Sequence, residues 1–306
     1  MRVVDTFAGC GGLSKGFEDA GFNVVAAFEY WDTAIDCYKA NFGHPIIKQD
    51  LSNVLDSVNK INSMAPDMII GGPPCQDFSH AGKRDEGARA SLTGAIAEII
   101  SKARPRYFVM ENVDRSRNSK AYLQARDILK DAGYGLTEKV LDASFCGVPQ
   151  RRKRFFCIGA LAKEDGFLDY YLERNLSKKE MTIRDYMGEE LGLEFYYRHP
   201  RNYSRRGIFT IDEPSPTVRG VNRPVPKGYL GHHNDPAPID TPKLRPLTTL
   251  ERARLQTFPK NFQWFGTKTD MEQIIGNAVP VKLAEFVARA LGEYLHEYEE
   301  KFRRVA

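Results

Sequence analysis

At 306 residues, with 42% hydrophobic and 27% charged side chains, the chain has the composition of a globular protein with a sizeable core. No apolar run is long enough to cross a bilayer, no signal-peptide layout opens the chain, and the five cysteines are scattered without a CxxC pair. We therefore expect a cytoplasmic protein with neither a disulfide framework nor a zinc site, whose net charge of +4 permits a polyanionic partner without requiring one.

The first predicted elements are a buried strand over residues 3–7, a glycine-rich turn over 8–12 and a helix that ends near Gly21. A strand, a glycine turn and a helix N-terminus together form a corner that suits a nucleotide. Ser14 replaces the last glycine of the dinucleotide fingerprint, so a nicotinamide or flavin cofactor is disfavoured. A simple tight turn is the alternative for this segment.

The next two predicted strands, over 24–28 and 46–49, are each followed by an acidic residue. Glu29 follows the first, where a carboxylate suits the hydroxyls of a ribose. Asp50 follows the second, where its oxygens can accept a hydrogen bond from an exocyclic amine such as that of adenine. Together with the glycine turn, these strand ends predict a nucleoside-bearing cofactor.

A lone cysteine, Cys75, stands in a glycine- and proline-rich segment, 71–79, that follows the apolar run 68–70. Prolines fix φ and remove N–H donors, so this segment is expected to be a rigid loop after a buried strand. Such a loop lies at the ligand-binding edge of an α/β sheet and can hold a nucleophile, although a small buried cysteine is the alternative. The polar stretch 81–87 either closes over a ligand or is a solvated loop.

Helices and strands alternate over the next part of the chain. We expect helices over 92–103 and 122–132 and strands over 107–110, 135–143 and 155–158. Glu111 directly follows the strand that comes after the Cys75 loop, so its carboxylate is expected beside that loop. The basic cluster 150–154 precedes the last of these strands, from which its guanidinium groups can reach a site.

Beyond Lys163 the periodicity weakens as far as about Lys243, and arginines alternate with tyrosines. This basic, aromatic-laced segment is the best candidate for a phosphate-contacting surface. Helical periodicity resumes after this segment. It predicts a helix near 249–256, for which Thr249 is a plausible cap, and a last helix from Val281 to about Lys301.

Six short motifs stand out along the chain. They are FAGCGG at 7–12, PPCQ at 73–76, ENV at 111–113, QRRKR at 150–154, RPLTTLERARLQTFP at 245–259 and GNAVP at 276–280. In this order they make the chain resemble, over nearly its full length, the DNA cytosine-5 methyltransferase family of bacterial modification enzymes. Any one motif is weak or moderate alone, whereas six in the right order are very specific.

The resemblance implies an α/β fold, in which a Rossmann-like, mostly parallel sheet with flanking helices is joined to a small irregular target-recognition domain. The implied catalytic and cofactor-binding domain covers residues 1–162, and the target-recognition domain covers 163–243. The C-terminal segment 244–306 is expected to pack back on the first domain.

The resemblance also implies covalent catalysis with S-adenosylmethionine as methyl donor and without a metal. Cys75 would attack C6 of cytosine, and Glu111 would supply a proton or a strong donor at N3. Arg154 would hold the O2 oxygen of the base, with Arg152 supporting the same pocket less directly. The residues implied to bind the cofactor are Phe7, Ala8, Gly9, Gly11, Gly12, Glu29, Tyr30, Asp50, Leu51, Pro73, Leu92, Asn277 and Ala278.

The implied partner is double-stranded DNA, from which the target cytosine is extruded. The residues expected to contact DNA, as phosphate contacts or guanine readers, are Gln76, Ser79, Arg201, Arg205, Arg206, Thr217, Arg219 and Arg223. A cognate restriction endonuclease is a candidate partner in the same system, and we expect a monomer on DNA.

The departures from the family pattern lie in the segment 89–93, where Ala90 replaces a usual glycine and Thr93 a common phenylalanine. Two alternatives of the same architecture are a transfer-RNA cytosine-5 methyltransferase and a non-catalytic DNA-binding relative. The first typically carries a Cys-Phe-Thr tripeptide, which this sequence lacks. The second would lack the cysteine or the glutamate, whereas Cys75 and Glu111 are both present.

Overall fold

The computed structural model describes residues 1–74, 90–202 and 204–305, of which 90, 91 and 299–305 are described by their backbone alone. The chain forms two compact units. Unit 1 comprises Met1–Leu141, Lys153–Leu176 and Ala284–Ala306, and unit 2 comprises Asp142–Arg152 and Ser177–Leu283. None of the described helices is long and apolar enough to cross a membrane. The domain boundaries expected at 162/163 and 243/244 stay a prediction.

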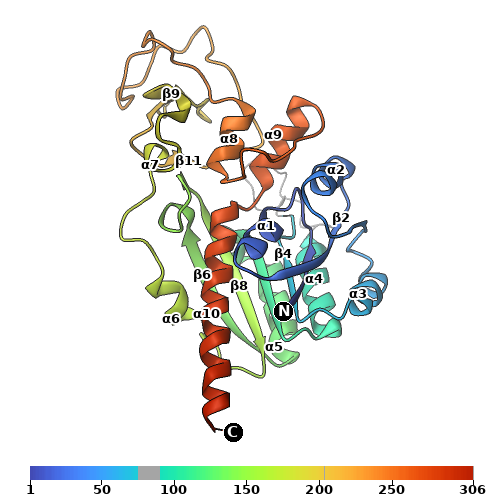
Figure 1. Ribbon diagram of the computed structural model, residues 1–306. Coiled ribbons are helices and arrows are strands. Elements are labelled where there is room, and N and C mark those ends of the chain that lie inside the picture. Colours follow the sequence, from blue (N-terminus) through green and yellow to red (C-terminus); the bar gives the residue numbers. More distant parts are fainter. Residues whose placement is uncertain (75–89, 203, 306) are drawn as a thin grey trace. The chain divides into compact units, whose positions relative to one another are not determined.

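Unit 1 is built on a seven-stranded sheet with the strand order β3-β2-β1-β4-β5-β8-β6 (Figure 1). The strands are β1 (Arg2–Thr6), β2 (Asn23–Glu29), β3 (Ile46–Lys48), β4 (Met68–Gly71), β5 (Tyr107–Val113), β6 (Tyr134–Asp142) and β8 (Lys153–Leu161). From β3 to β5 all neighbours are parallel, and β8 runs antiparallel to β5. The strand order reverses between β1 and β4, and such a switch point is where open α/β sheets bind ligands.

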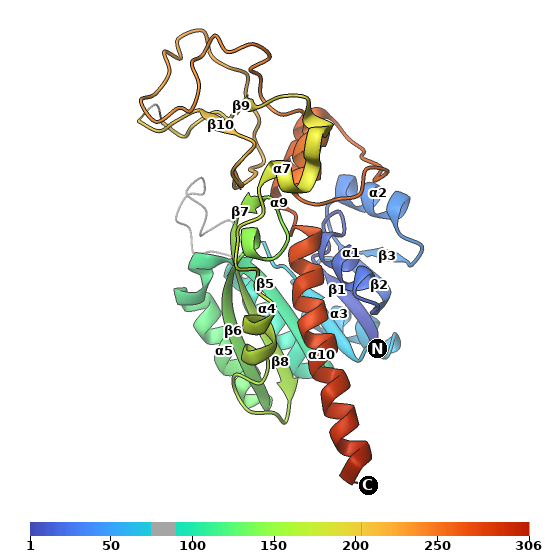
Figure 2. The ribbon, with the colours of Figure 1, turned by 60° about the vertical axis from the view of Figure 1, so that its left-hand side comes forward.

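Helices cover both faces of this sheet, as expected for strands that are apolar on both sides. On one face lie α3 (Val54–Ser63), α4 (Ala90–Ala103) and α5 (Lys120–Asp131). Figures 1 and 2 show α1 (Gly12–Asp19) and α10 (Val281–Val305) on the other face. The mostly parallel sheet with flanking helices confirms the predicted fold class.

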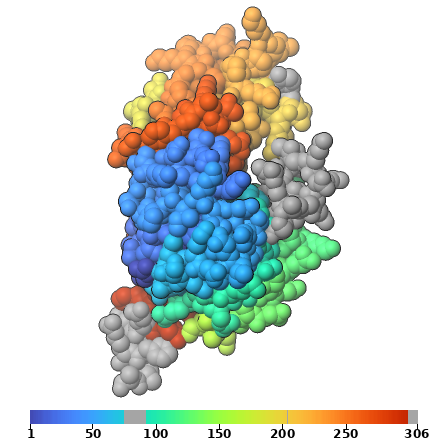
Figure 3. All heavy atoms as spheres, turned by 90° about the vertical axis from the view of Figure 1, so that its right-hand side faces the viewer, coloured from blue at the N-terminus to red at the C-terminus, as the bar shows by residue number. Residues whose placement is uncertain are grey.

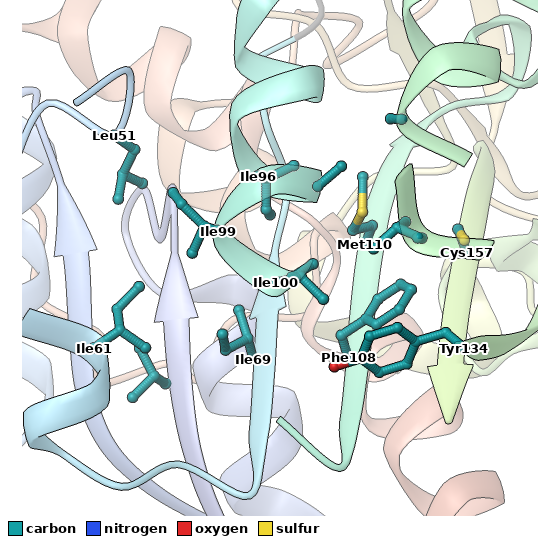
Figure 4. Close-up of a cluster of buried hydrophobic side chains, with 14 of the residues drawn as sticks. Leu51, Ile61, Ile69, Ile96, Ile99, Ile100, Phe108, Met110, Tyr134 and Cys157 are labelled. Atoms are coloured by element: carbon teal, nitrogen blue, oxygen red, sulfur yellow. The ribbon is translucent and has the colours of Figure 1, made fainter. Parts of the chain in front are cut away.

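The core of unit 1 lies between the sheet and α3, α4 and α5. Figure 4 shows Ile96, Ile99 and Ile100 of α4 directed at the strands that carry Ile69 and Phe108. All five side chains are fully buried. This packing holds β4 and β5 side by side, and both strands lead into the candidate site.

At the edge of the sheet of unit 1 formed by β2 and β3, α2 (Asp32–Asn41) contacts both strands. Figure 3 shows that the first 74 residues gather on one face there, in blue to light blue. The predicted cofactor residues from Phe7 to Leu51 therefore belong to one continuous segment of the chain that lies on this face.

Unit 2 has short strands and long irregular connections. β7 (Gln150–Arg151) pairs with β11 (Ser215–Pro216), and β9 (Phe195–Tyr197) pairs with β10 (Ile208–Thr210). The core of the unit is formed by residues from β9 and β10 together with α7 (Ile183–Met187), α8 (Thr249–Leu255) and α9 (Lys268–Asn277).

The cap of α8 differs by one residue from the prediction. Thr248, not Thr249, is the N-cap: its hydroxyl accepts from the Glu251 backbone N–H, and the Glu251 carboxylate accepts from the Thr248 N–H. This capping box requires an acidic residue three positions after the cap, which Thr249 lacks. Thr249 instead donates to Glu272 Oε1 at 2.8 Å.

Candidate functional site

The turn after β1 is shaped by three residues with positive φ. Phe7, Gly9 and Gly11 have φ of 56°, 55° and 95°. A Cβ on Gly11 would collide with the ring of Phe42, so the turn and α2 approach each other only because this position is glycine. A Cβ on Gly9 would meet no described atom within 4 Å. The space next to Gly9 on the Cβ side is therefore not filled by any described atom.

Glu29 at the end of β2 ties this turn to the neighbouring strand. Its Oε2 accepts from the Gly9 N–H at 2.7 Å, and its Oε1 accepts from the Tyr30 and Trp31 N–H groups at 2.7 and 2.9 Å. A carboxylate has about four acceptor positions, so Oε2 can still accept from a ligand hydroxyl. The ring of Tyr30 is 65% exposed beside this carboxylate and is available for stacking.

The remaining predicted cofactor residues of unit 1 differ in exposure. Asp50 is exposed, and hydrogen bonds from Ser52 lower the pKa of its carboxyl. Leu51 is buried in the core beneath it, whereas Leu92 in α4 is half-buried. Phe7 is half-buried, and Ala8, Gly12 and Pro73 are buried. Their roles in cofactor binding stay predictions.

A buried carboxyl, Asp5, lies beneath the glycine turn. Its Oδ2 accepts from the Ser14 hydroxyl at 2.6 Å and from the Ser14 N–H at 3.2 Å. The Ser14 oxygen lies 2.6 Å from the Tyr38 hydroxyl, which lies 2.6 Å from His44 Nε2. Burial raises the pKa of Asp5 to about 7, against the opposing effect of the Ser14 hydrogen bonds.

This raised pKa predicts a stability that falls with rising pH. Between about pH 4 and pH 7 the unfolded chain loses the Asp5 proton while the folded chain keeps it, and above pH 7 the loss is complete. The difference between 3.8 and about 7 corresponds to about 4 kcal/mol. Asp5→Asn, which imitates the protonated carboxyl, should be more stable than the wild type at pH 8 by up to that amount.

The gain should vanish near pH 4, where both proteins carry a neutral group. Urea unfolding of the two proteins at pH 4 and pH 8 measures the difference, because all other titrations are shared. An equal difference in stability at both pH values would mean that folding does not raise the pKa of Asp5.

The end of β4 is held close to its neighbours by two glycines. A Cβ on Gly71 would collide with Thr6 of β1, and a Cβ on Gly72 would lie 3.1 Å from Glu111 Oε2. Asn112 donates to the Pro73 carbonyl at 3.4 Å. These contacts bring Pro73 and Glu111 together, as predicted. Of the residues that follow, Cys75, Gln76 and Ser79 lie outside the described part of the chain.

Glu111 and Arg154 form an ion pair at the end of the sheet. Arg154 Nε lies 2.9 Å from Glu111 Oε1, and the side chains are 14% and 9% exposed. The antiparallel register sets Arg154 of β8 opposite Val113 of β5, which brings the two side chains together. A nearly buried carboxyl beside a guanidinium presents an acceptor and several donors to the edge of a planar polar base.

Arg152 lies two residues before Arg154 but belongs to unit 2. Its side chain is 1% exposed. Its Nη1 donates to the Val218 carbonyl at 2.9 Å, and its Nη2 donates to the Gly276 and Ala278 carbonyls at 2.9 and 3.0 Å. Arg152 thus links β7 to the loop after β11 and to the end of α9.

Two buried glutamines, which sequence reasoning did not single out, complete this framework. Gln150 donates to Gln256 Oε1 at 2.8 Å and accepts from the Val218 N–H at 2.8 Å. Gln256 in turn donates to the Ile275 and Ala278 carbonyls at 2.6 and 3.0 Å. Both glutamines stand in motifs noted above. Their presence in these short motifs was the only sign in the sequence that they have a structural role.

Asn277 and Ala278 lie at the end of α9 in unit 2. Asn277 is exposed, and its Oδ1 accepts from Gln273 at 3.0 Å. The carbonyl of Ala278 accepts from Arg152 and Gln256. Their predicted part in the cofactor pocket stays a prediction.

Gly276 precedes them and allows a close backbone contact. A Cβ at this position would overlap the Gly220 backbone nitrogen. Gly276→Ala should therefore destabilise the protein by about 1–3 kcal/mol, because backbone rather than a flexible side chain must move. Gly94→Ala in α4 is the control: its Cβ would meet no described atom within 4 Å, and alanine favours the helix. Thermal unfolding of both variants checks this, and equal melting temperatures would contradict it.

The predicted DNA-contacting residues of unit 2 fall into two groups. Arg201, Arg205 and Arg223 are exposed. The others already bind within the unit. Arg206 pairs with Glu213 at 2.5 Å, Arg219 donates to the His199 carbonyl at 2.5 Å, and the Thr217 hydroxyl donates to the Arg151 carbonyl at 2.9 Å. The exposed group is free to meet a polyanion.

No cluster of three or more His, Cys, Asp or Glu side chains that could hold a metal ion occurs in the described ranges 1–74, 90–202 and 204–305. The polar clusters of the candidate site are instead hydrogen-bonded and ion-paired groups.

Known proteins are similar to the chain in sequence and in fold. The family model of C-5 cytosine-specific DNA methylase matches residues 1–293. Type II methyltransferase M.HindV of Haemophilus influenzae is 59% identical over 292 residues, which cover 95% of this chain and 96% of that protein. Type II methyltransferase M.HgiDI of Herpetosiphon aurantiacus is 52% identical over 298 residues, which cover 97% and 96%. The crystal structure of the S. pombe Dnmt2 methyltransferase has a similar fold, with a TM-score of 0.71, 20% identity and coverage of 96% and 99%.

Proposed function

The chain belongs to the family of C-5 cytosine-specific DNA methylases, and from this we propose that it methylates C5 of cytosine at a specific site in double-stranded DNA, as the modification enzyme of a type II restriction–modification system. The observation that carries the proposal is the Glu111–Arg154 pair, which lies next to the strand end that leads to Cys75. A restriction endonuclease is the proposed partner of the system, and the protein acts as a monomer on DNA.

The cofactor is S-adenosylmethionine, which supplies an electrophilic methyl group. Fit is supported by the open space at Gly9 and by the orientation of Glu29, whose three backbone donors fix its carboxylate at the end of β2. Glu29 would bind the ribose hydroxyls, Asp50 would accept from the adenine amine, and the exposed Tyr30 would stack on adenine.

The nucleophile is the Cys75 thiolate. It attacks C6 of the extruded cytosine, so that the Sγ–C6 bond forms and the ring electrons move toward C5. Glu111, which must take up a proton before this step because its carboxylate is paired with Arg154, gives that proton to N3 and so neutralises the charge that develops in the ring. Arg154 donates to the O2 oxygen from the same side.

C5, now electron-rich, would take the methyl group of S-adenosylmethionine while the bond between that methyl carbon and the sulfonium sulfur breaks, which leaves the thioether S-adenosylhomocysteine. A base would then remove the C5 proton. The electron pair of the C5–H bond re-forms the C5–C6 double bond, the Sγ–C6 bond breaks, and Cys75 leaves as a thiolate. N3 returns its proton to Glu111, so every group is restored.

DNA recognition belongs to unit 2. The exposed side chains of Arg201, Arg205 and Arg223 neutralise backbone phosphates or read guanines. Arg152 donates to three backbone carbonyls within unit 2 and would support the base pocket less directly, through this framework.

The test is to incubate the purified protein with random-sequence duplex DNA and S-adenosylmethionine and then to sequence the DNA for 5-methylcytosine. Methylation confined to one short sequence supports the proposal. Methylation of transfer RNA but not of DNA would favour the RNA enzyme, and binding of S-adenosylmethionine without methylation of either would favour a non-catalytic relative.

A further inference from the structure

We propose that unit 2 holds a phosphate-binding site, distinct from the exposed Arg201 and Arg205, in a pocket beside β9 and β11. The lining of this arginine pocket includes Arg198, Arg219, Arg223, Arg252, Tyr196 and Ser215. If the bound phosphate belongs to DNA, the inference rests on the proposed function. If the bound phosphate is free phosphate, the inference does not depend on that function.

The pocket has positive charge in excess. Arg252 forms an ion pair with Glu272, and Arg198, Arg219 and Arg223 are in the lining as well. Among the described residues that line the pocket there is no aspartate or glutamate. The pKa of Arg198 is lowered to about 10, mainly by burial and next by the positive charge of the neighbouring Arg219. Guanidinium groups packed this closely repel one another unless an anion lies between them.

Two buried hydroxyls in the lining point to the same ligand. Tyr196 and Ser215 are 2% and 1% exposed, and within the described part of the chain neither Tyr196 Oη nor Ser215 Oγ has a hydrogen-bond partner. Burial of an unpaired hydroxyl costs free energy, so native proteins rarely tolerate it without a compensating contact. A phosphate oxygen accepts from both hydroxyls and from the guanidinium groups.

The loop that carries Arg219 and Arg223 is held firmly, which preorganises the pocket. The Arg252 side chain donates to the Arg219 carbonyl, and Asn222 donates to the Leu247 carbonyl at 2.8 Å and to Glu272 Oε1 at 3.2 Å. Arg198 donates to the Thr217 carbonyl at 2.8 Å on the other side. An anion that enters therefore meets donors already in place.

The probe is inorganic phosphate, titrated into the full-length protein and followed by calorimetry in a buffer without other oxyanions. We expect saturable binding to one site. Tyr196→Phe and Ser215→Ala should each weaken the affinity about tenfold, since each removes one hydrogen bond to a charged group. Because each removes an unpaired hydroxyl, the melting temperature without phosphate should stay equal or rise.

The matched controls are Tyr229→Phe and Ser204→Ala, which remove hydroxyls of unit 2 outside the pocket. The Tyr229 hydroxyl donates to Asp235 at 2.7 Å and the Ser204 hydroxyl donates to Asn202 at 2.7 Å, so these changes affect stability rather than phosphate affinity. Absence of saturable binding, or equal affinity in all four variants, would overturn the proposal.

The source of the phosphate follows from competition. If duplex DNA displaces the bound phosphate and both pocket variants also weaken DNA binding, the site takes a DNA phosphodiester. If DNA leaves phosphate binding unchanged, the site takes free phosphate. Methylation by the wild type without any phosphate binding would reject the pocket and leave the proposed function intact.

Discussion

Glu111→Gln should lower the rate of methyl transfer to cytosine by about 10²–10⁴-fold, the range typical of removing a general acid. Glutamine keeps the size of the side chain and its acceptor oxygen, but it has no proton to give to N3. The nearly buried position of Glu111 against Arg154 means that no bulk water replaces it easily. Single-turnover kinetics with duplex DNA measures the chemical step directly.

Glu138→Gln is a closely matched control for this change. Glu138 also lies in unit 1, and its Oε2 lies 2.9 Å from Arg126 Nε, the same distance that separates Glu111 from Arg154. Loss of this pair should leave the rate within a factor of two or so, because surface ion pairs contribute little. A Glu111→Gln enzyme that keeps the wild-type rate would remove Glu111 from the chemistry.

Arg152→Met should destabilise unit 2 by about 3–5 kcal/mol. Methionine nearly fills the space, but it takes away the donors to three buried carbonyls, those of Val218, Gly276 and Ala278. Each such hydrogen bond from a charged group contributes about 1.5–3 kcal/mol, and the partial loss of three gives the expected total. The loop after β11 and the end of α9 should loosen together.

Fluorescence of Trp264 measures this loss. Trp264 packs on the core of unit 2, and the only other tryptophan, Trp31, lies in unit 1 and can be replaced by phenylalanine in both proteins. Arg151→Met, next along the chain, removes two hydrogen bonds to Glu180 from a half-exposed side chain and should cost less than about 1 kcal/mol. Equal urea midpoints for the two variants would contradict the account.

Local patterns in the sequence were enough to predict the strands of unit 1, whereas the mostly parallel sheet with flanking helices was implied by the resemblance. Apolar runs followed by a glycine turn, by Glu29 and by Asp50 mark three neighbouring parallel strands, because parallel strands end at one edge of a sheet. The structure places these residues at the ends of β1, β2 and β3. The resemblance implied that Glu111 and Arg154 hold the same base, but their ion pair was not predicted.

The framework around Arg152 was not predictable in the same way. The three carbonyls it binds lie 66, 124 and 126 residues further along the chain, and backbone carbonyls leave no mark in a sequence. The same holds for Gln150 and Gln256, which meet across 106 residues. The cap of α8 is different in kind. The prediction of Thr249 was wrong by one residue because Glu251, which completes the capping box, stands three positions after Thr248.

The most direct test of the central claim is the reaction of the protein with duplex DNA that contains 5-fluorocytosine, in the presence of S-adenosylmethionine. Fluorine at C5 cannot be eliminated as a proton is, so the covalent intermediate should persist. We predict a denaturant-stable protein–DNA adduct whose formation disappears with Cys75→Ser. An enzyme that methylates ordinary cytosine in DNA but forms no adduct, or whose adduct survives Cys75→Ser, would contradict attack by Cys75.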